Sequence, residues 1–245
     1  MLAETHSAHG ARLNGFDQHM LQRRSPPTGL DSIAVIARRN RGEEIHGSDA
    51  ADDHWYRVLA GVVKCYVVLP GGRRQILDLL LPNDFFGFTP HCGHYFSLEA
   101  VVNDTVVACY PRRRAEALAD SDPSIGHEVR DMMSDAVSRL QELLLILGRT
   151  TAREKVGSFL LKMMERCSKQ PADRVLLPTS RYDIADYLAL SVETVSRSLT
   201  ELKHRGLIAL AGPRRVQIVD RHGLEDDDFP RETALGDRLD PVKLQ

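Results

Sequence analysis

The hydrophobic period of the sequence changes near Pro111, and this change limits the folds that the chain can adopt. Before Pro111, apolar residues come in short runs that are separated by Gly, Pro, Asn and Asp, as is typical of β-strands. After it, they recur every three or four residues, which is the spacing of one helix face. The sequence therefore predicts an α+β protein with a β-rich N-terminal half and a helical C-terminal half.

Six short runs predict the strands of the N-terminal half. They cover 33–37, 56–60, 62–69, 75–81, 96–102 and 105–110. Pro70-Gly71-Gly72 lies between the third and fourth runs and predicts a hairpin turn, because glycine accepts the positive φ of a tight turn. This spacing of strands favours a sandwich or a barrel. Residues 1–30 lack the pattern, and we expect a flexible arm there.

A long apolar stripe begins after Asp122-Pro123 and predicts a helix over 122–149. From Ile125 the stripe advances by four, three, four, four, three and four residues, as in a coiled coil. We interpret it as a dimerisation seam, although it could instead pack against the β-domain of its own chain. The predicted seam residues are Val129, Met132, Ala136, Leu140, Leu143 and Leu147.

Two short helical patterns joined by a three-residue turn have the spacing of a helix-turn-helix. Ser191 is a natural N-cap for the second helix, and Gly206 follows that helix at its C-terminal end. A β-hairpin wing around Gly212-Pro213 comes next. In order, the predicted elements are a helix over 151–167, a strand over 175–177, helices over 180–188 and 192–205, and wing strands over 207–210 and 216–219.

The early residues of the second helix reach base edges if this helix enters a major groove. Glu193 can accept from cytosine N4, and Arg197 can make a bidentate contact to guanine. Equally, the two could form a surface ion pair four residues apart that does not read DNA. The predicted DNA-contact set is Ser191, Glu193, Thr194, Ser196, Arg197, Arg181, Arg214 and Arg215.

The charge distribution favours a local nucleic-acid surface. The whole chain has 32 basic and 34 acidic residues, which excludes a wholly basic protein. Residues 174–221 hold eight Arg and Lys against five Asp and Glu, a net charge of +3. Arg181 and the Arg214-Arg215 pair are candidate phosphate clamps, with a solvated surface as the alternative. Residues 223–245 are acidic and are predicted to be a flexible tail.

Apolar runs such as 143–147 are much too short to span a membrane, and the N-terminus lacks an apolar signal region. We therefore expect a cytoplasmic protein without a membrane partner. The four cysteines, Cys65, Cys92, Cys109 and Cys167, show no CxxC spacing. A disulfide framework or a zinc finger is not expected.

Three segments resemble the Crp-Fnr family of bacterial transcription regulators. The first is Gly61–Cys65 with the turn Asn83–Gly87, the second is Leu147–Val156 (LGRTTAREKV), and the third is Leu190–Arg197 (LSVETVSR). The second resembles the FixK branch in particular. The resemblance covers about 31–222. It implies an N-terminal double-stranded β-roll like that of cyclic-nucleotide-binding proteins (31–121), a long dimerisation helix (122–149) and a C-terminal winged helix-turn-helix (150–222).

The resemblance also implies a function. Glu193, Ser196 and Arg197 are arranged as in regulators that read TTGAT half-sites, and Val192 stands where cyclic AMP-responsive members place an arginine. The chain is expected to be an activator that binds TTGAT-N4-ATCAA-like inverted repeats as a homodimer. Its targets would be genes for oxygen-limited metabolism or nitrogen fixation, and RNA polymerase would be a further partner.

No cofactor is expected. Relatives that bind cyclic AMP use a Glu in the Gly-rich turn and an Arg-Ser pair, whereas this chain has Phe88 and Phe96-Ser97. Relatives with an iron-sulfur cluster use N-terminal cysteines, and residues 1–64 contain none. The His91–His94 run could bind metal or haem, but it lacks a fourth ligand and is interpreted as a polar loop.

Two other functional classes compete with this interpretation. One is a regulator of the same family that is gated by a small ligand or a redox signal at the β-roll. The other is a metal enzyme on a cupin-like barrel that uses His46, His54, His91 and His94. The chain contains no nucleophile elbow, Walker loop or HExxH motif, so we do not expect an enzyme.

Overall fold

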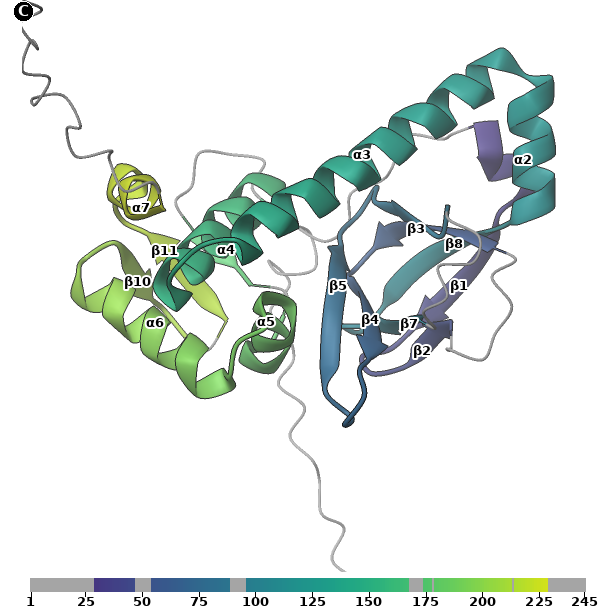
Figure 1. The fold of residues 1–245 in the computed structure, drawn as a ribbon. Helices are drawn as coiled ribbons and strands as arrows, with labels where there is room; N and C mark the ends of the chain where they lie inside the picture. The colour runs from purple at the N-terminus through teal and green to yellow at the C-terminus, as the bar shows by residue number, and fades with distance from the viewer. Residues whose placement is uncertain are drawn as a thin grey trace, which may run out of the picture. The chain divides into compact units, whose positions relative to one another are not determined.

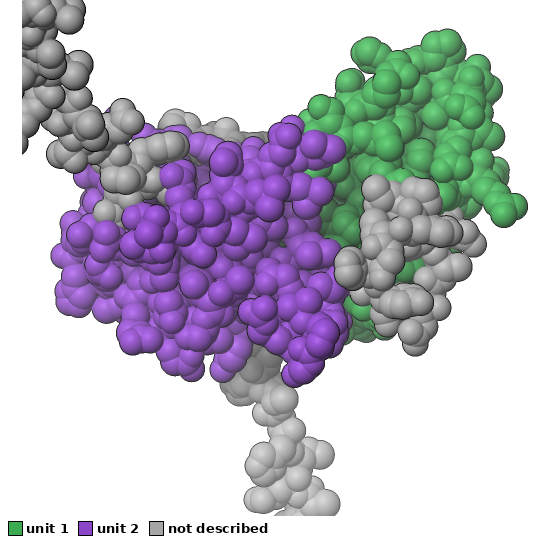
Figure 2. Space-filling model, viewed as in Figure 1, with its two compact units in different colours: residues 1–65, 79–136 green, residues 66–78, 137–245 purple. Residues whose placement is uncertain are grey.

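The computed structural model describes residues 29–46, 54–88, 96–167, 174–177, 179–212 and 214–228. The His91–His94 run, Pro213, residues 1–28 of the predicted arm and residues 229–245 of the predicted tail lie outside these ranges. The chain divides into two compact units, residues 1–65 with 79–136 and residues 66–78 with 137–245 (Figure 2). We describe them separately below.

Two four-stranded sheets form the predicted β-roll (Figure 1). One has the strand order β1-β8-β3-β6 and the other β2-β7-β4-β5. The pairs β1–β8, β3–β8 and β2–β7 are antiparallel. The strands are β1 (Val35–Arg39), β2 (Glu44–His46), β3 (His54–Ala60), β4 (Val63–Val68), β5 (Arg74–Leu80), β6 (Phe85–Phe86), β7 (Phe96–Ala100) and β8 (Thr105–Pro111).

The core of the first unit is aromatic and is closed by helices. Trp55, Phe85 and Tyr110 are almost fully buried, and the Phe85 and Tyr110 rings stack with centroids 5.7 Å apart. Ile125 and Val129, from the first turns of α3 (Pro123–Leu147), belong to the same buried cluster. The start of the long helix is therefore part of the β-roll core.

Strands β2 and β6 and two short helical elements of this unit were not expected from the sequence. The 3-10 helix η1 (Gly29–Ile33) buries Leu30 completely, so the predicted arm over 1–30 reaches too far by at least two residues. Helix α2 (Arg112–Ser121) follows β8 directly and buries Ala115. Its first turn consists of three arginines, which hides the helical pattern.

The second unit contains the predicted helix-turn-helix with its wing. Its elements after α3 are α4 (Ala152–Cys167), β9 (Arg174–Leu176), α5 (Arg181–Leu188), α6 (Val192–His204), β10 (Ile208–Leu210), β11 (Arg215–Ile218) and α7 (Arg221–Asp228). Strands β10, β11 and β9 form a three-stranded sheet in that order. The strand and helix predictions for this unit are therefore confirmed to within about two residues.

Helix α7 corrects the prediction of a flexible tail from residue 223. Leu224 is only 1% exposed and lies over Gly157 of α4. Arg221 is paired with Glu165 of α4 at 2.7 Å and with Glu225 at 2.6 Å. This packing was hidden in the sequence because a single apolar residue anchors an otherwise charged segment.

The long helix carries two different apolar faces, and the predicted seam mixes them. Val129 and Leu143 are each 7% exposed, because they pack within their own chain, and Met132 packs against the β-roll core. Ala136 and Leu147 are half-buried, so only Leu140 of the six predicted seam residues is exposed. The exposed stripe is instead Met133, Val137, Leu140 and Leu144. None of the helices within the described ranges is long and apolar enough to cross a membrane.

Gly61 should be essential for the turn between β3 and β4. It has a φ of +85°, and a Cβ there would lie 2.8 Å from the Cα of Thr105. We expect Gly61→Ala to lower the free energy of unfolding by about 3 kcal/mol, from a left-handed backbone penalty of about 1–2 kcal/mol and overpacking of about 1–3 kcal/mol. Urea denaturation followed by circular dichroism measures this change.

The matched control for this prediction is Gly71→Ala. Gly71 has a similar φ of +93°, but a Cβ there would meet nothing within 4 Å. Its substitution should therefore cost only the backbone penalty of about 1–2 kcal/mol. Equal losses in the two variants would contradict the close approach at Thr105.

Candidate nucleic-acid interface

Local hydrogen bonds fix both helices of the helix-turn-helix. Ser180 and Asp183 form a capping box at the start of α5, in which each side chain accepts from the backbone N–H of the other at 3.1 Å. Ala189 adopts a left-handed conformation with φ 54° and ends α5. Ser191 then caps α6, as predicted, by accepting from the Thr194 N–H at 3.1 Å.

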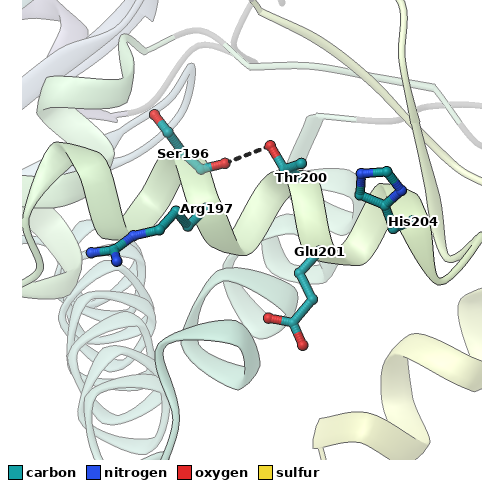
Figure 3. A pocket seen from close by; sticks show the side chains of 5 residues that line it. All are labelled: Ser196, Arg197, Thr200, Glu201 and His204. Atoms are coloured by element: carbon teal, nitrogen blue, oxygen red, sulfur yellow. Dashed lines mark hydrogen bonds between the residues drawn. The ribbon is translucent and has the colours of Figure 1, made fainter.

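One side of α6 belongs to the core and the other faces solvent. Val195, Leu199 and Leu202 are at most 2% exposed. On the opposite side, polar side chains that follow one another along the helix line a shallow pocket (Figure 3). The residues that line it are Ser196, Arg197, Thr200, Glu201 and His204. The predicted pair Ser196 and Arg197 is thus brought together with three residues that the sequence did not single out.

Glu193 and Arg197 lie one helical turn apart on α6, and both side chains are exposed. A hydrogen bond from its own backbone N–H lowers the pKa of Glu193, and the Ser191 hydroxyl and the charge of Arg197 lower it further. Glu193 is therefore an ionised acceptor at neutral pH. It can receive a hydrogen bond from a base amino group.

Arg181 and Ser196 are also brought together. The Arg181 Nη1 donates to Ser196 Oγ at 3.3 Å, which connects the first turn of α5 to α6. Arg181, a predicted phosphate contact, is thus hydrogen-bonded to Ser196, a predicted base contact. Ser191 and Thr194 have a local role as well, since their hydroxyls lie 2.9 Å apart within the cap.

Glu201 is the one acidic residue in this pocket, and its charge is compensated. Arg153, from the first turn of α4, donates to Glu201 Oε1 at 2.5 Å, and Arg205 Nε lies 3.9 Å from the same oxygen. This pairing reduces the repulsion that an acidic side chain would exert on a phosphate backbone. The wing adds Arg214, which is half-buried, and Arg215, which is exposed.

His46, Cys65 and Cys109 of the β-roll lie among other side chains of the domain. His46 is buried, with its Nδ1 2.9 Å from the Tyr56 hydroxyl, and it stacks on Phe96. Cys65 is fully buried, and burial raises the pKa of the Cys109 thiol. Within the described ranges, no group of three or more His, Cys, Asp or Glu side chains is placed to hold a metal ion.

Comparison with known proteins connects both units to one family. Residues 38–122 match the cyclic nucleotide-binding domain model, and residues 154–227 match the Crp-like helix-turn-helix domain model. The chain is 36% identical to the nitrogen fixation regulation protein FixK of Rhizobium meliloti, over 81% of this chain and 89% of that protein. It is 41% identical to the protein of the same name from Azorhizobium caulinodans, over 80% of this chain and 78% of that protein.

A solved structure agrees with these matches. The structure of FixK2 from Bradyrhizobium japonicum superposes with a TM-score of 0.70 at 35% identity. The match covers 79% of this chain and 96% of that structure. From its two domain matches, its relatives and its fold, the chain belongs to the Crp-Fnr family of transcription regulators, in the FixK-like branch.

Proposed function

We propose that this protein is a FixK-type transcription activator that binds TTGAT-N4-ATCAA-like inverted repeats as a homodimer. The observation that carries the proposal is the capped helix α6, which presents Glu193, Ser196 and Arg197 on its solvent side. The names of the relatives support genes of nitrogen fixation as targets. Genes of oxygen-limited metabolism are the second target class that we propose. The protein would act in the cytoplasm, with RNA polymerase as its further partner.

The chemistry of the half-site suits this helix face. TTGAT holds a single G·C pair, and a guanidinium is the side chain that best matches guanine O6 and N7. Arg197 is exposed and can present its guanidinium there, while the ionised Glu193 can accept from the cytosine amino group. Arg181 and Arg215 lie outside α6 and are the candidates for phosphate contacts.

The exposed stripe on α3 supports the homodimer. Met133, Val137, Leu140 and Leu144 are 40%, 53%, 48% and 68% exposed, and they follow one another by four, three and four residues. This is the spacing with which two helices pack side by side. A second copy of the same helix is the partner whose apolar pattern has the same period.

The proposal includes no cyclic nucleotide, although the β-roll matches a domain that is named for one. At the Gly87-Phe88 turn, Phe88 packs against Trp55 with ring centroids 5.2 Å apart. Arg112 donates to the carbonyl oxygens of both turn residues, at 2.5 Å for Gly87 and 2.9 Å for Phe88. These bonds support a β-roll without a bound nucleotide, because the guanidinium near the described part of this turn is already bonded to the backbone.

Iron-sulfur and haem cofactors are likewise left out of the proposal. Residues 1–64 contain no cysteine, and the first cysteine, Cys65, is a fully buried strand residue. The buried His46 is held by Tyr56 and Phe96. These observations support a regulator whose DNA binding needs no bound cofactor.

Binding to a duplex that carries TTGAT-N4-ATCAA tests the proposed function. Arg197→Ala should lose about 1–3 kcal/mol of discrimination against a scrambled duplex in each half-site, a weakening of roughly 5- to 150-fold per half-site on the specific site alone. Arg181→Ala should weaken both duplexes and reduce the slope of log K against log salt by about 1.8, or about 0.9 for each copy in the dimer. Fluorescence anisotropy at several salt concentrations separates the two effects.

Arg113→Ala, an exposed arginine on α2, is the control and should bind like the wild type. Equal wild-type affinity for the specific and scrambled duplexes would disprove the proposed half-site. Loss of affinity for both duplexes in Arg197→Ala would instead make Arg197 a phosphate contact.

Substitution in the exposed stripe tests the homodimer. Leu140→Asp places a carboxylate in both copies of the seam, and we expect the dimer dissociation constant to rise by about 100-fold. Sedimentation velocity at a fixed protein concentration measures the change from dimer to monomer. Ser138→Asp adds the same charge on an exposed position well away from the stripe and should leave the dimer intact. A dimer that tolerates Leu140→Asp would locate the interface elsewhere.

A further inference from the structure

A buried ion pair joins the β4–β5 hairpin to the long helix within the second unit. Arg139 of α3 donates from Nε to Asp78 Oδ2 of β5 at 3.0 Å. The side chains are only 10% and 7% exposed. Because residues 66–78 and 137–245 belong to the same compact unit, this pair lies inside the unit that carries the helix-turn-helix.

A buried lysine extends the pair to α4. Lys162 donates from Nζ to the backbone carbonyl of Arg139 at 3.2 Å, and it is paired with Glu142 of α3 at 3.1 Å. The Lys162 side chain is 7% exposed, and its burial lowers its pKa. Asp78, Arg139, Glu142 and Lys162 are called the ion network below.

The same hairpin also contacts the first helix of the helix-turn-helix. Gln75 donates from Nε2 to the Tyr187 carbonyl at 3.4 Å, and Arg74 Nε lies 3.9 Å from Asp186 Oδ2. Tyr187 is fully buried, and its ring packs on Phe159 of α4 with centroids 5.7 Å apart. Burial raises the pKa of Tyr187, and so does the charge of Asp78.

Stability alone does not account for such a network. Charged groups lose their hydration on burial, so well-packed apolar residues in the same place are often equally stable or more stable. Buried, directional hydrogen bonds do fix one relative arrangement of the elements that they join, where apolar contacts allow several. Here they join β5, α3 and α4, and the hairpin side chains of Arg74 and Gln75 reach α5.

We propose that Asp78 and Arg139 are positioning residues for DNA recognition, which hold α5, and through it α6, in the orientation that binds DNA. This inference rests on the proposed function. The route from α5 to α6 is direct, because the two helices pack together and Arg181 donates to Ser196. The apparent affinity of a protein for its ligand falls in proportion to the fraction of molecules in the competent arrangement. Loss of the ion network therefore weakens DNA binding without removing any DNA contact.

The test separates folding from DNA binding. The variants are Asp78→Asn, which removes one charge without changing the shape, and Asp78→Leu/Arg139→Met, which replaces the pair with apolar side chains. The Kd for the TTGAT-N4-ATCAA duplex is measured with each protein after its active fraction has been determined by titration at saturating duplex. With this correction, a fraction of unfolded protein does not raise the measured Kd.

We expect the Kd of the double variant to rise about tenfold with an unchanged salt slope, even where its melting temperature returns to that of the wild type. A Kd for the specific duplex that rises more than threefold in both variants supports the inference. A rise of threefold or less in either variant overturns it and leaves the ion network with a structural role only.

The matched control is Lys64→Met/Glu99→Leu. It removes another ion pair of low exposure, 2.8 Å long, between β4 and β7 of the first unit. Its Kd, measured with the active fraction of the protein, should equal that of the wild type. A rise in Kd equal to that of the Asp78 variants would show that loss of any ion pair of low exposure has this effect, and it would overturn the inference. Wild-type protein that fails to distinguish the specific duplex from a scrambled one would instead disprove the proposed half-site.

Discussion

The packing of the first turns of α3 into the β-roll determines which faces of the rest of the long helix are buried and which are exposed. Ile125 and Val129 share a buried cluster with Trp55, Phe85 and Tyr110. Because side chains three and four residues apart share a helix face, this contact fixes the rotation of the helix about its axis. The stripe that contains Leu140 is then left on the solvent side, while Arg139, one residue earlier, turns inward to Asp78. One helix thereby serves the core, the proposed dimer and the ion network with three separate faces.

Elements with a strong local signal could be predicted from the sequence, and those that depend on distant contacts could not. The six predicted strands of the β-roll and both helices of the helix-turn-helix have clear periodicity or capping residues such as Ser191, so they lie close to where the sequence puts them. The short strands β2 and β6 have no such local signal and were not predicted. Helix α7 exists because Leu224 fits over Gly157, far away in the sequence. The seam predicted on α3 includes Val129 and Leu143, which the chain buries itself, because periodicity finds apolar stripes but does not show which of two adjacent stripes the chain uses for its own core.

The same distinction applies to the candidate site. Glu193, Ser196 and Arg197 could be named in advance because their spacing places them on one side of a short capped helix. The contacts that hold α5 and α6 could not be named, because they join residues that are far apart in the sequence. Arg153 and Glu201 are separated by 48 positions, and Gln75 and Tyr187 by 112. Nothing local to either member of these pairs indicates its partner.

Control by a ligand requires two arrangements of the protein that the ligand binds with different affinity. In this chain, two charged side chains of the kind that a charged ligand could bind are bonded to the protein itself. The Arg112 guanidinium is held by the carbonyls of the Gly87-Phe88 turn, and Asp78 is held by Arg139. We infer that each internal bond favours one arrangement of the folded protein without a ligand. Under the proposed function, the DNA-binding arrangement is then the ground state of the folded protein, and the amount of protein sets the amount of bound operator.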